Sequence, residues 1–316
     1  MPRLPHRRSS SGGPRAVVVG DLVVDVVVKP QRPLESGTDV PGLVSIRQGG
    51  SAANTARWLG RLGVRTTLIT AVGRDPAGRA LVSAIETERL KVRASRVSGA
   101  RTGRIGVVVG PGGERSFVAD RGAADMLRAT DLQPEWFEDA DLLHLPAYSL
   151  IAALGPAARR AVELTRAAGG VVSVDLASVG PLLEGGRRAA VAMIAETAPD
   201  LLFATSAEAE ALLGMHVAEG LLDLAPIAVV KRGSKGATVF AREPSERVRF
   251  EVATERLLVT DTTGAGDAFD AGFIADWLGT RTSGRSIATG LRRAAVAGHR
   301  AAARQLVAER PEIPLV

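Results

Sequence analysis

Short apolar runs that alternate with helical segments constrain the fold of this chain more than any other feature. The runs are typical of strands buried on both faces of a parallel sheet, and they occupy residues 16–19, 65–72, 141–145, 171–175, 200–203 and 227–231. Segments with helical spacing lie at residues 77–90, 155–168, 184–198 and 206–213. Strand and helix alternate, so the sequence predicts an α/β fold with a mostly parallel central sheet.

Two stretches break this alternation. Residues 23–46 are rich in β-type residues and carry no helical pattern. Residues 101–118 are typical of a hairpin with its turn at Gly110-Pro111-Gly112-Gly113. We therefore expect a small second sheet, formed by segments at about 23–46 and 101–120, that closes over a site as a lid.

Composition narrows the class of protein. Residues 1–14 are rich in Arg, Ser, Gly and Pro and are expected to form a disordered tail. The chain has no cysteine, which excludes disulfides and thiolate chemistry and favours a cytoplasmic location. No apolar run is long enough to span a bilayer, so no membrane partner is expected.

The net charge of +6 raises the question of nucleic-acid binding. Only four of the 40 basic residues are lysine, so the charge reflects an arginine bias that runs through the whole chain. Aromatic residues make up 3% of the chain, too few for base-stacking surfaces. We expect no nucleic-acid partner.

The segment Asp261–Phe269, Asp-Thr-Thr-Gly-Ala-Gly-Asp-Ala-Phe, carries the strongest chemical signal. Gly264, Ala265 and Gly266 leave backbone N–H groups bare at the start of a helical pattern, and a helix N-terminus is an anion site. Asp267 places a carboxylate in that site. A carboxylate in that position has a chemical role if it takes a proton from a hydroxyl group while the amides hold the phosphoryl group that is transferred to the hydroxyl oxygen.

A second glycine-rich turn, Gly49-Gly50-Ser51-Ala52-Ala53-Asn54, precedes another helical segment. Gly49 and Gly50 allow a ligand close to the backbone, and Asn54 can donate and accept hydrogen bonds to a polyol. An ordinary strand-to-helix turn explains the segment equally well. Asp25 could accept two sugar hydroxyls, or it could be an exposed residue of an edge strand.

Together these segments resemble the ribokinase-like (PfkB) family of sugar and nucleoside kinases. Residues 49–63 and 261–269 are similar to its two signatures, and residues 73–78 and 231–236 are similar to further family segments. The resemblance implies a three-layer α/β/α domain over residues 15–316 with a small β-sheet lid. It implies an ATP-dependent carbohydrate kinase that uses Mg²⁺, and many members of the family respond to K⁺.

The resemblance also implies residue roles. Asp267 would be the catalytic base, and the amides of Gly264, Ala265 and Gly266 would form the anion hole. The sugar would be held by Asp25, Gly49, Gly50 and Asn54. The nucleotide would be bordered by Lys231, Gly233, Gly236, Thr263, Gly264 and Gly266.

One segment departs from the family pattern. Where the family has Asn-x-x-Glu, this chain has Thr205-Ser206-Ala207-Glu208. Glu208 would act on Mg²⁺ indirectly, through water, and the Thr205 hydroxyl can still hydrogen-bond a metal-bound water. Alternatively, Glu208 is a solvated acid in the first turn of a helix.

Other features bear on metal sites and on the substrate. The four histidines, His6, His144, His216 and His299, show no metal-ligand spacing, and no Walker-type phosphate loop is present. Ser51 stands where several phosphosugar kinases of the family have Lys, and Phe117 is the one aromatic residue of the lid segments; both favour a free sugar or sugar acid.

Arginines of the second lid segment suggest how a sugar acid would be recognised. Arg104, Arg115 and Arg121 could pair with a substrate carboxylate, or they could be solvated surface residues. The alternatives to a sugar or sugar-acid kinase are a nucleoside kinase and a catalytically degenerate ligand-binding protein. Because lid sheets have open edges, we expect a homodimer.

Overall fold

The structure, a computed structural model, describes residues 13–110, 114–214, 218–243, 247–257, 259, 261–280, 287–308 and 312–313. Most of the tail expected over residues 1–14, the hairpin turn at residues 111–113, His6 and His216 lie outside the described residues. None of the helices in the described ranges combines the length and apolar character that a membrane span requires.

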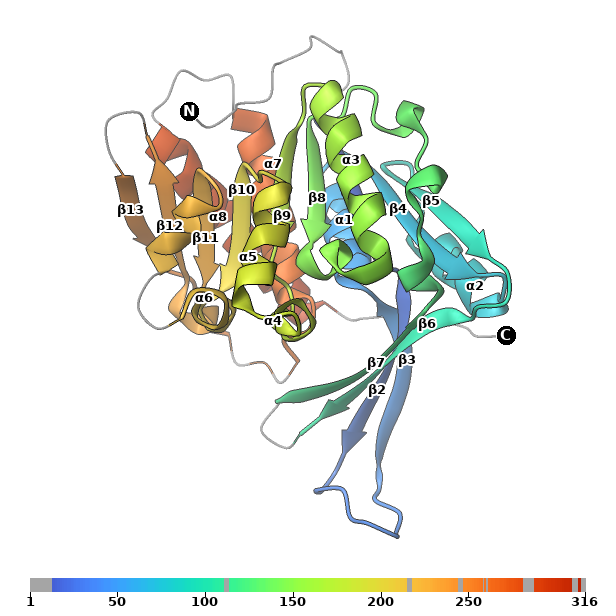
Figure 1. Ribbon diagram of the computed structural model, residues 1–316. Helices are drawn as coiled ribbons and strands as arrows, with labels where there is room; N and C mark the ends of the chain where they lie inside the picture. Colours follow the sequence, from blue (N-terminus) through green and yellow to red (C-terminus); the bar gives the residue numbers. More distant parts are fainter. Residues whose placement is uncertain are drawn as a thin grey trace.

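A nine-stranded sheet runs through the centre of the described chain (Figure 1). In spatial order its strands are β13 (Arg247–Val252), β12 (Ala237–Arg242), β11 (Ile227–Lys231), β10 (Leu201–Thr205), β9 (Val171–Asp175), β8 (Leu142–Pro146), β1 (Arg15–Val19), β4 (Arg65–Gly73) and β5 (Leu90–Val97). From β11 to β5 every neighbouring pair is parallel, and only β12 and β13 join antiparallel.

Helices cover both faces of this sheet. One face packs against α1 (Ser51–Arg61), α2 (Pro76–Ile85), α7 (Ala265–Thr280) and α8 (Ile287–Val307), and the other against α3 (Gly155–Ala167), α4 (Val179–Leu183), α5 (Arg187–Glu196) and α6 (Ser206–Leu213). Alternate side chains of one strand enter opposite cores: Val18 packs with the first set, and Val17 and Val19 with the second. The continuous apolar runs arise because both faces are buried. The expected three-layer α/β/α class is confirmed.

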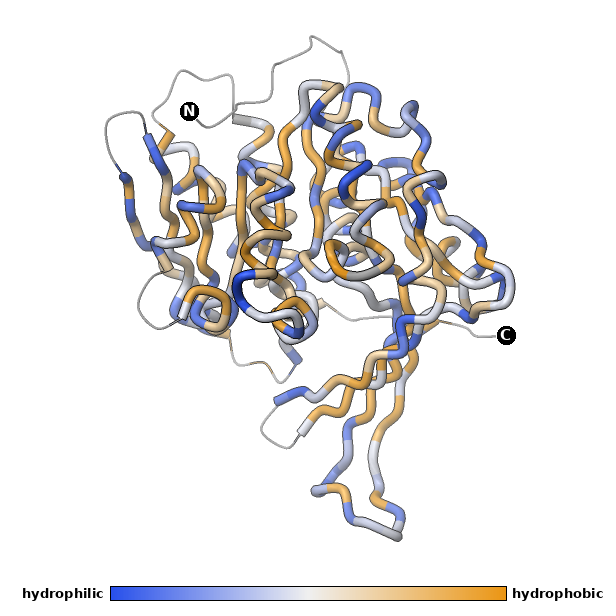
Figure 2. Tube along the Cα trace, viewed as in Figure 1, coloured by the Kyte–Doolittle hydropathy of each residue, from blue (hydrophilic) through white to orange (hydrophobic). Residues whose placement is uncertain are grey.

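A separate small sheet projects from the central one (Figure 1). Its strands are, in order, β3 (Gly42–Gly49), β2 (Val23–Pro30), β6 (Thr102–Val109) and β7 (Arg115–Gly122). Only β2 and β6 pair in parallel. Polar and apolar residues mix along these strands (Figure 2), whereas the central strands are mainly apolar. The edge-strand interpretation of Asp25 is wrong, because β2 lies between β3 and β6 and Asp25 is buried.

Several element boundaries differ from those expected. The helix predicted over residues 77–90 ends at Ile85, and a turn closed by a hydrogen bond from the Thr87 N–H to the Leu90 carbonyl leads into β5. The helix predicted over residues 184–198 begins at Arg187, since Gly186, with φ of 86°, separates α4 from α5. The antiparallel pair β12–β13 was not predicted. Short 3₁₀ turns occupy Ala123–Met126, Ala129–Asp131, Pro134–Trp136, Ala147–Leu150, Ala152–Leu154, Ala218–Asp223 and Gly233–Lys235.

Near the glycine-rich segment, α7 packs closely against α8. A Cβ atom added at Gly298 would lie 2.9 Å from two ring carbons of Phe269 and 2.9 Å from the Phe269 carbonyl oxygen. The absence of a side chain at Gly298 therefore lets α8 pack directly on the helix that carries Asp267.

Gly298→Ala should lower the free energy of unfolding by about 1–3 kcal/mol, because overpacking forces the two helices apart. Gly290→Ala on the same helix is the matched control: no described atom lies within 4 Å of its added Cβ. There the higher helix propensity of alanine should stabilise by up to ~1 kcal/mol. Urea unfolding of both variants measures the difference, and equal effects would contradict this account of the packing.

Candidate active site

The carboxyl ends of the parallel strands gather polar side chains at one edge of the central sheet. Asp175, Thr205 and Lys231 are the last residues of β9, β10 and β11. Asp21 follows β1, and Tyr148 follows β8. Because parallel strands present their carboxyl ends on the same side, residues distant in the sequence meet there.

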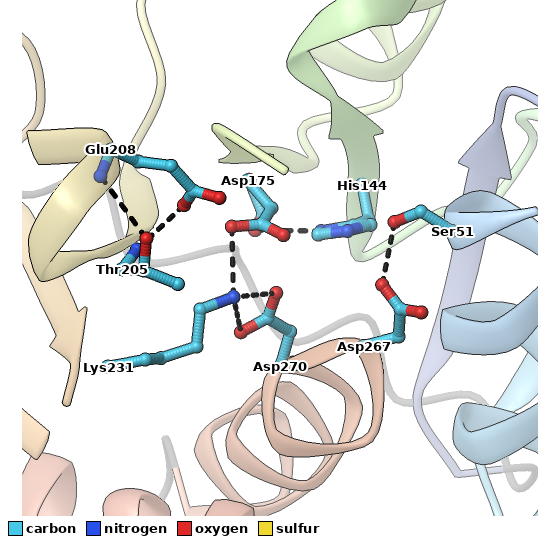
Figure 3. Close-up of polar contacts among 9 residues, drawn as sticks. Ser51, His144, Asp175, Thr205, Glu208, Lys231, Asp267 and Asp270 are labelled. Atoms are coloured by element: carbon cyan, nitrogen blue, oxygen red, sulfur yellow. Dashed lines mark hydrogen bonds and ion pairs between the residues drawn. The ribbon is translucent and has the colours of Figure 1, made fainter. Parts of the chain in front are cut away.

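Asp267 lies in the first turn of α7 and is held by α1. Its Oδ1 accepts a hydrogen bond of 2.7 Å from the Ser51 hydroxyl, and its Oδ2 accepts one of 2.9 Å from the Asn54 amide (Figure 3 draws the Ser51 contact). Burial raises the pKa of Asp267 to about 6, although these two hydrogen bonds oppose the shift. The carboxylate is thus oriented, ionised above about pH 6, and more basic than an ordinary aspartate.

The glycine turn before Asp267 starts α7. Gly264 has φ of 74°, and the helix begins at Ala265. Amides in the first turn of a helix have no intrahelical acceptor and lie at its positive end. The Ala265 N–H lies at 3.3 Å from the Thr262 carbonyl oxygen, a long contact that leaves it open to a better acceptor.

The last helix, α8, also contacts this turn. The Gln305 side chain of α8 donates to the Thr263 carbonyl at 3.0 Å and accepts from the Trp58 indole at 2.8 Å. Trp58 and Trp277 are buried, as expected for core residues. The turn is therefore joined through Gln305 to both α8 and α1.

The four residues predicted to hold a sugar lie where β2 and β3 meet α1. A Cβ atom added at Gly49 would come within 1.9 Å of an Asp25 carboxylate oxygen, so only glycine allows this approach. Gly50 is the N-cap residue of α1, with φ of 103°. Asn54 accepts from Gln48 at 3.2 Å while its own amide donates to Asp267. The structure thus brings Asn54 directly to Asp267.

A neighbouring group that was not predicted as a unit joins Asp21, Tyr148 and Arg121. The Tyr148 hydroxyl donates to Asp21, and the Arg121 guanidinium lies 4.3 Å above the Tyr148 ring and 3.6 Å from the Asp21 carboxylate. Arg121 also donates to Asp125 at 2.7 Å, while its Nη2 is buried without a partner among the described residues. Burial raises the pKa of Tyr148, so this phenol is neutral.

The other two lid arginines lie elsewhere. Arg104 is exposed on β6. Arg115, at the start of β7, donates to the Thr263 hydroxyl at 2.7 Å, and that hydroxyl donates to Asp261 at 2.6 Å. Two more cations of the small sheet reach the same acid, since Lys29 and Arg47 lie 3.8 Å and 3.7 Å from the Asp261 carboxylate. The small sheet is therefore joined to the glycine turn.

Lys231 was predicted to border a nucleotide, but its ammonium group contacts carboxylates. Its Nζ donates to Asp175 at 3.0 Å and to the two oxygens of Asp270 at 3.1 Å and 3.0 Å (Figure 3). Burial disfavours the charged ammonium, but Asp175 and Asp270 outweigh it and raise the pKa of Lys231. Gly233 and Gly236 flank the turn that joins β11 to β12, and their contact with a nucleotide stays a prediction.

Sequence reasoning missed Asp175 and Asp270. A signal existed for each. Asp175 is the polar end of an apolar strand, which in a parallel sheet points to the ligand edge. Asp270 is an acid among apolar residues of α7, three residues after Asp267, and this spacing places both acids on neighbouring parts of one helix face.

Thr205 and Glu208 form a capping box at the start of α6. The Glu208 N–H donates to the Thr205 hydroxyl at 3.2 Å, and the Glu208 carboxylate accepts from the Thr205 N–H at 2.7 Å (Figure 3). Burial raises the pKa of Glu208, with the Asp175 charge adding to the effect. Glu208 is thus a partly buried capping residue with one carboxylate oxygen free of the box, rather than a fully solvated acid.

This arrangement fits an indirect contact with Mg²⁺. Mg²⁺ in nucleotide sites is held by one or two carboxylates, phosphate oxygens and several waters, rather than by an all-protein cage. The described ranges contain no group of three or more side chains that could hold a metal. Glu208 could hold a metal-bound water through its free oxygen, while the Thr205 hydroxyl oxygen already accepts a bond within the box.

The histidines of the described chain are structural. His144 is fully buried in β8, with its Nδ1 at 3.1 Å from the Ser173 hydroxyl. Burial lowers the pKa of His144 to about 4, so its ring is neutral at physiological pH. His299 packs edge-on against Phe269, 5.0 Å between ring centroids.

Comparison with known proteins places this geometry in a family. The model of the pfkB family carbohydrate kinases matches residues 14–310. A fructokinase of Rhizobium leguminosarum bv. trifolii is 28% identical over 243 residues, which cover 72% of this chain and 70% of the relative. An ATP-dependent ribose-1-phosphate kinase of Halopiger xanaduensis is 31% identical over 274 residues, 84% of this chain and 85% of the relative.

Solved structures agree on the fold. Adenosine kinase from Sinorhizobium meliloti superposes with a TM-score of 0.80 at 23% identity, covering 96% of this chain and 98% of its own. A putative ribokinase II from E. coli, in complex with ATP and Mg²⁺, gives a TM-score of 0.76 at 24% identity over 94% of each chain. The resemblance of the two glycine-rich segments is confirmed: the chain belongs to the PfkB family of carbohydrate kinases, which are ATP-dependent phosphotransferases with a ribokinase-like fold.

Proposed function

We propose that this chain transfers the γ-phosphoryl group of ATP to a hydroxyl group of a small sugar or sugar acid, with Asp267 as the general base. The observation that supports the proposal is the pair of hydrogen bonds from Ser51 and Asn54, which hold the Asp267 carboxylate in the first turn of α7, next to the amides of the proposed anion hole. The amides of Gly264, Ala265 and Gly266 are the proposed anion hole.

Each part has a defined task in the transfer. Asp267 takes the proton of the acceptor hydroxyl as its oxygen bonds to phosphorus and the bond to the ADP oxygen breaks. The first-turn amides stabilise the charge on the moving phosphoryl group, and each well-placed donor of this kind is worth about 3 kcal/mol. Mg²⁺ bound with ATP would neutralise phosphate charge, and Glu208 is its proposed contact through water. A requirement for K⁺ stays a prediction.

The acceptor is proposed to lie between the small sheet and α1, against Asp25, Gly49, Gly50 and Asn54. Relatives named for fructose and ribose-1-phosphate favour a small sugar over a nucleoside. Phe117, the aromatic residue of the second lid segment, is 58% exposed and lies beside Arg115, an arrangement that gives no support to stacking of a base. The Arg121 Nη2 has no hydrogen-bond partner among the described residues, which favours an acceptor with a carboxylate.

A screen of ADP release tests the proposed reaction directly. The wild-type protein is incubated with Mg²⁺-ATP and a panel of neutral sugars, sugar acids, phosphosugars and nucleosides. We expect acceptor-dependent turnover with a sugar or sugar acid. Turnover with nucleosides alone would identify a nucleoside kinase, and ligand binding without any turnover would identify a degenerate binding protein.

The proposed homodimer would use the small sheet. Four large apolar side chains on its two outer strands are exposed, namely Leu43, Val44, Phe117 and Val118. Such a surface on open strands favours pairing with a second copy. Sedimentation velocity tests this, since Val44→Lys with Val118→Lys should shift a dimer to monomer. The expected cytoplasmic location stays a prediction.

Asp267→Asn should lower kcat by about 10²–10⁴-fold, because the proton acceptor is lost. Binding of ATP and acceptor should persist, because an asparagine side chain keeps the shape and can still bond Ser51 and Asn54. Isothermal titration calorimetry and initial rates measure the two effects separately. Asp276→Asn on the same helix, where Asp276 pairs with Arg293 at 3.0 Å, is the control, and near wild-type turnover of Asp267→Asn would remove Asp267 from the chemistry.

The same substitution should stabilise the fold at neutral pH. Burial raises the pKa of Asp267 from 3.8 to about 6, so the ionised form costs stability above pH 6. Asp267→Asn should therefore raise the free energy of unfolding by ~1–3 kcal/mol at pH 7.5, with the gain disappearing as pH falls toward 4. Thermal unfolding across that pH range measures the difference from wild type. A gain that is constant with pH would argue against a raised pKa.

Glu208→Gln should raise the Mg²⁺ concentration needed for half-maximal rate by about tenfold, because loss of a residue that orients a metal-bound water typically weakens metal binding by 10–100-fold. Glutamine can still serve in the capping box, so the helix should persist. Glu210→Gln, an exposed residue of the same helix, is the matched control. An unchanged Mg²⁺ dependence in Glu208→Gln would leave the residue with a capping role alone.

A further inference from the structure

One buried cation lies among several acids at the carboxyl edge of the central sheet. The carboxylates of Asp175 and Asp270 contact the ammonium group of Lys231, and the charge of Glu208 also acts on it. Asp267 lies one helical turn before Asp270. The Lys231 side chain is 10% exposed, and those of Asp175 and Asp270 are 4% and 0% exposed. Because these side chains have little contact with solvent, each carboxylate whose charge is not neutralised disfavours ionisation of the others.

The hydrogen bonds that the described residues make with Lys231 go to two carboxylates. An ammonium group has three donors. One faces Asp175 at 3.0 Å, and the two oxygens of Asp270 lie at 3.1 Å and 3.0 Å. The Asp270 contacts come from one carboxylate, so two acidic side chains hold Lys231 in place, and its charge acts on the surrounding groups.

That charge lies close to the catalytic turn. A Cβ atom added at Gly266 would come 3.5 Å from the Lys231 Nζ, so the ammonium group lies directly beside the backbone of the proposed anion hole. The bonds to Asp270 also join β11 to α7, the helix that carries Asp267.

The surroundings of Asp267 identify the groups that set its charge. From α1 its partners are the uncharged Ser51 and Asn54, and the Tyr148 phenol, which also interacts with Asp267, is neutral. From α8 the uncharged Gln305 holds the turn. The charged groups that face it come from β9, β11 and α7 itself, and they are Asp175, Lys231 and Asp270.

We propose that Lys231 is a positioning residue of this kinase: clamped by Asp175 and Asp270, it is a resident positive charge that keeps Asp267 ionised and fixes the first turn of α7. This role deepens the proposed function and rests on it. It differs from the expected nucleotide contact, because Lys231 acts through Asp270 and Asp267 rather than on ATP.

The test follows the titration of Asp267 by carbon-13 NMR of labelled aspartate carboxyl groups, with the signal assigned by its absence in Asp267→Asn. Lys231→Met removes the favourable charge and should raise the titration midpoint of Asp267 by about one pH unit or more. Asp175→Asn removes an unfavourable charge and should lower that midpoint. Opposite shifts from two neighbouring substitutions are a signature that a general loss of packing does not produce.

Kinetics give a second readout. In Lys231→Met the acid limb of the pH profile of kcat should move to higher pH. The loss of kcat should be about fivefold at pH 6 and should largely disappear above pH 8. KM for ATP should change little. Lys231→Arg, which keeps the charge, should restore the midpoint. A large rise in KM for ATP without a shifted limb would assign Lys231 to the nucleotide instead and overturn the proposal.

The control is Arg166→Met, which breaks a comparable ion pair with the buried Asp200, 2.5 Å long, near the amino ends of β9 and β10. It should lower stability and leave the Asp267 midpoint in place. If Lys231→Met does not fold, Lys231→Gln, which loses the charge but keeps hydrogen-bond donors, takes its place. A midpoint that stays constant in the folded Lys231 variant or in Asp175→Asn overturns the proposal.

The failure of the proposed function is a separate outcome. If wild-type protein shows no acceptor-dependent ADP release, or if Asp267→Asn remains active, the phosphotransfer role of Asp267 is lost. The NMR midpoints still report whether Lys231 controls the ionisation of Asp267.

Discussion

The two hydrogen bonds from α1 to the Asp267 carboxylate are the contact on which the rest of the site depends. Ser51 and Asn54 lie in the first turn of α1, and Asp267 lies in the first turn of α7. Both helices pack on the same face of the central sheet. The two glycine-rich turns, more than 200 residues apart in the chain, therefore meet as one site with a shared set of bonds.

Charge at the carboxyl edge of the sheet is costly and is compensated locally. Burying an isolated carboxylate is unfavourable, and a buried ion pair rarely adds stability over an apolar packing of the same size. The contacts among Lys231, Asp175 and Asp270 are therefore weak evidence for stability. In the proposed function these contacts would fix an electric field beside Asp267, the proposed proton acceptor, and this preorganisation would be made once, on folding, and not during each reaction.

The fold was largely predictable from the sequence, because the strands buried on both faces produce unmistakable apolar runs. In the structure, Asp75 is the N-cap of α2 and Pro76 is its first helical residue. The antiparallel strands β12 and β13 escaped prediction, and β13, at the edge of the sheet, alternates charged and apolar residues and so lacks the continuous apolar run of the parallel strands. Of the site, the meeting of Asp267 with Asn54 followed from the family resemblance. The partners of Lys231 did not, because pairing across β9, β11 and α7 depends on side-chain directions that a one-dimensional pattern does not contain.

The bridge from Arg115 through the Thr263 hydroxyl to Asp261 has a mechanical consequence. Three strands of the small sheet contact the loop before α7. Lys29 and Arg47 form ion pairs with Asp261, and Arg115 donates a hydrogen bond to Thr263. Gln305 anchors the same loop to α8 from the opposite direction. A tilt of the small sheet is thus transmitted to the backbone that would bind phosphate, while α8 holds the other side of the loop in place. The small sheet, where the sugar is proposed to bind, and the turn that would receive phosphorus are therefore mechanically coupled.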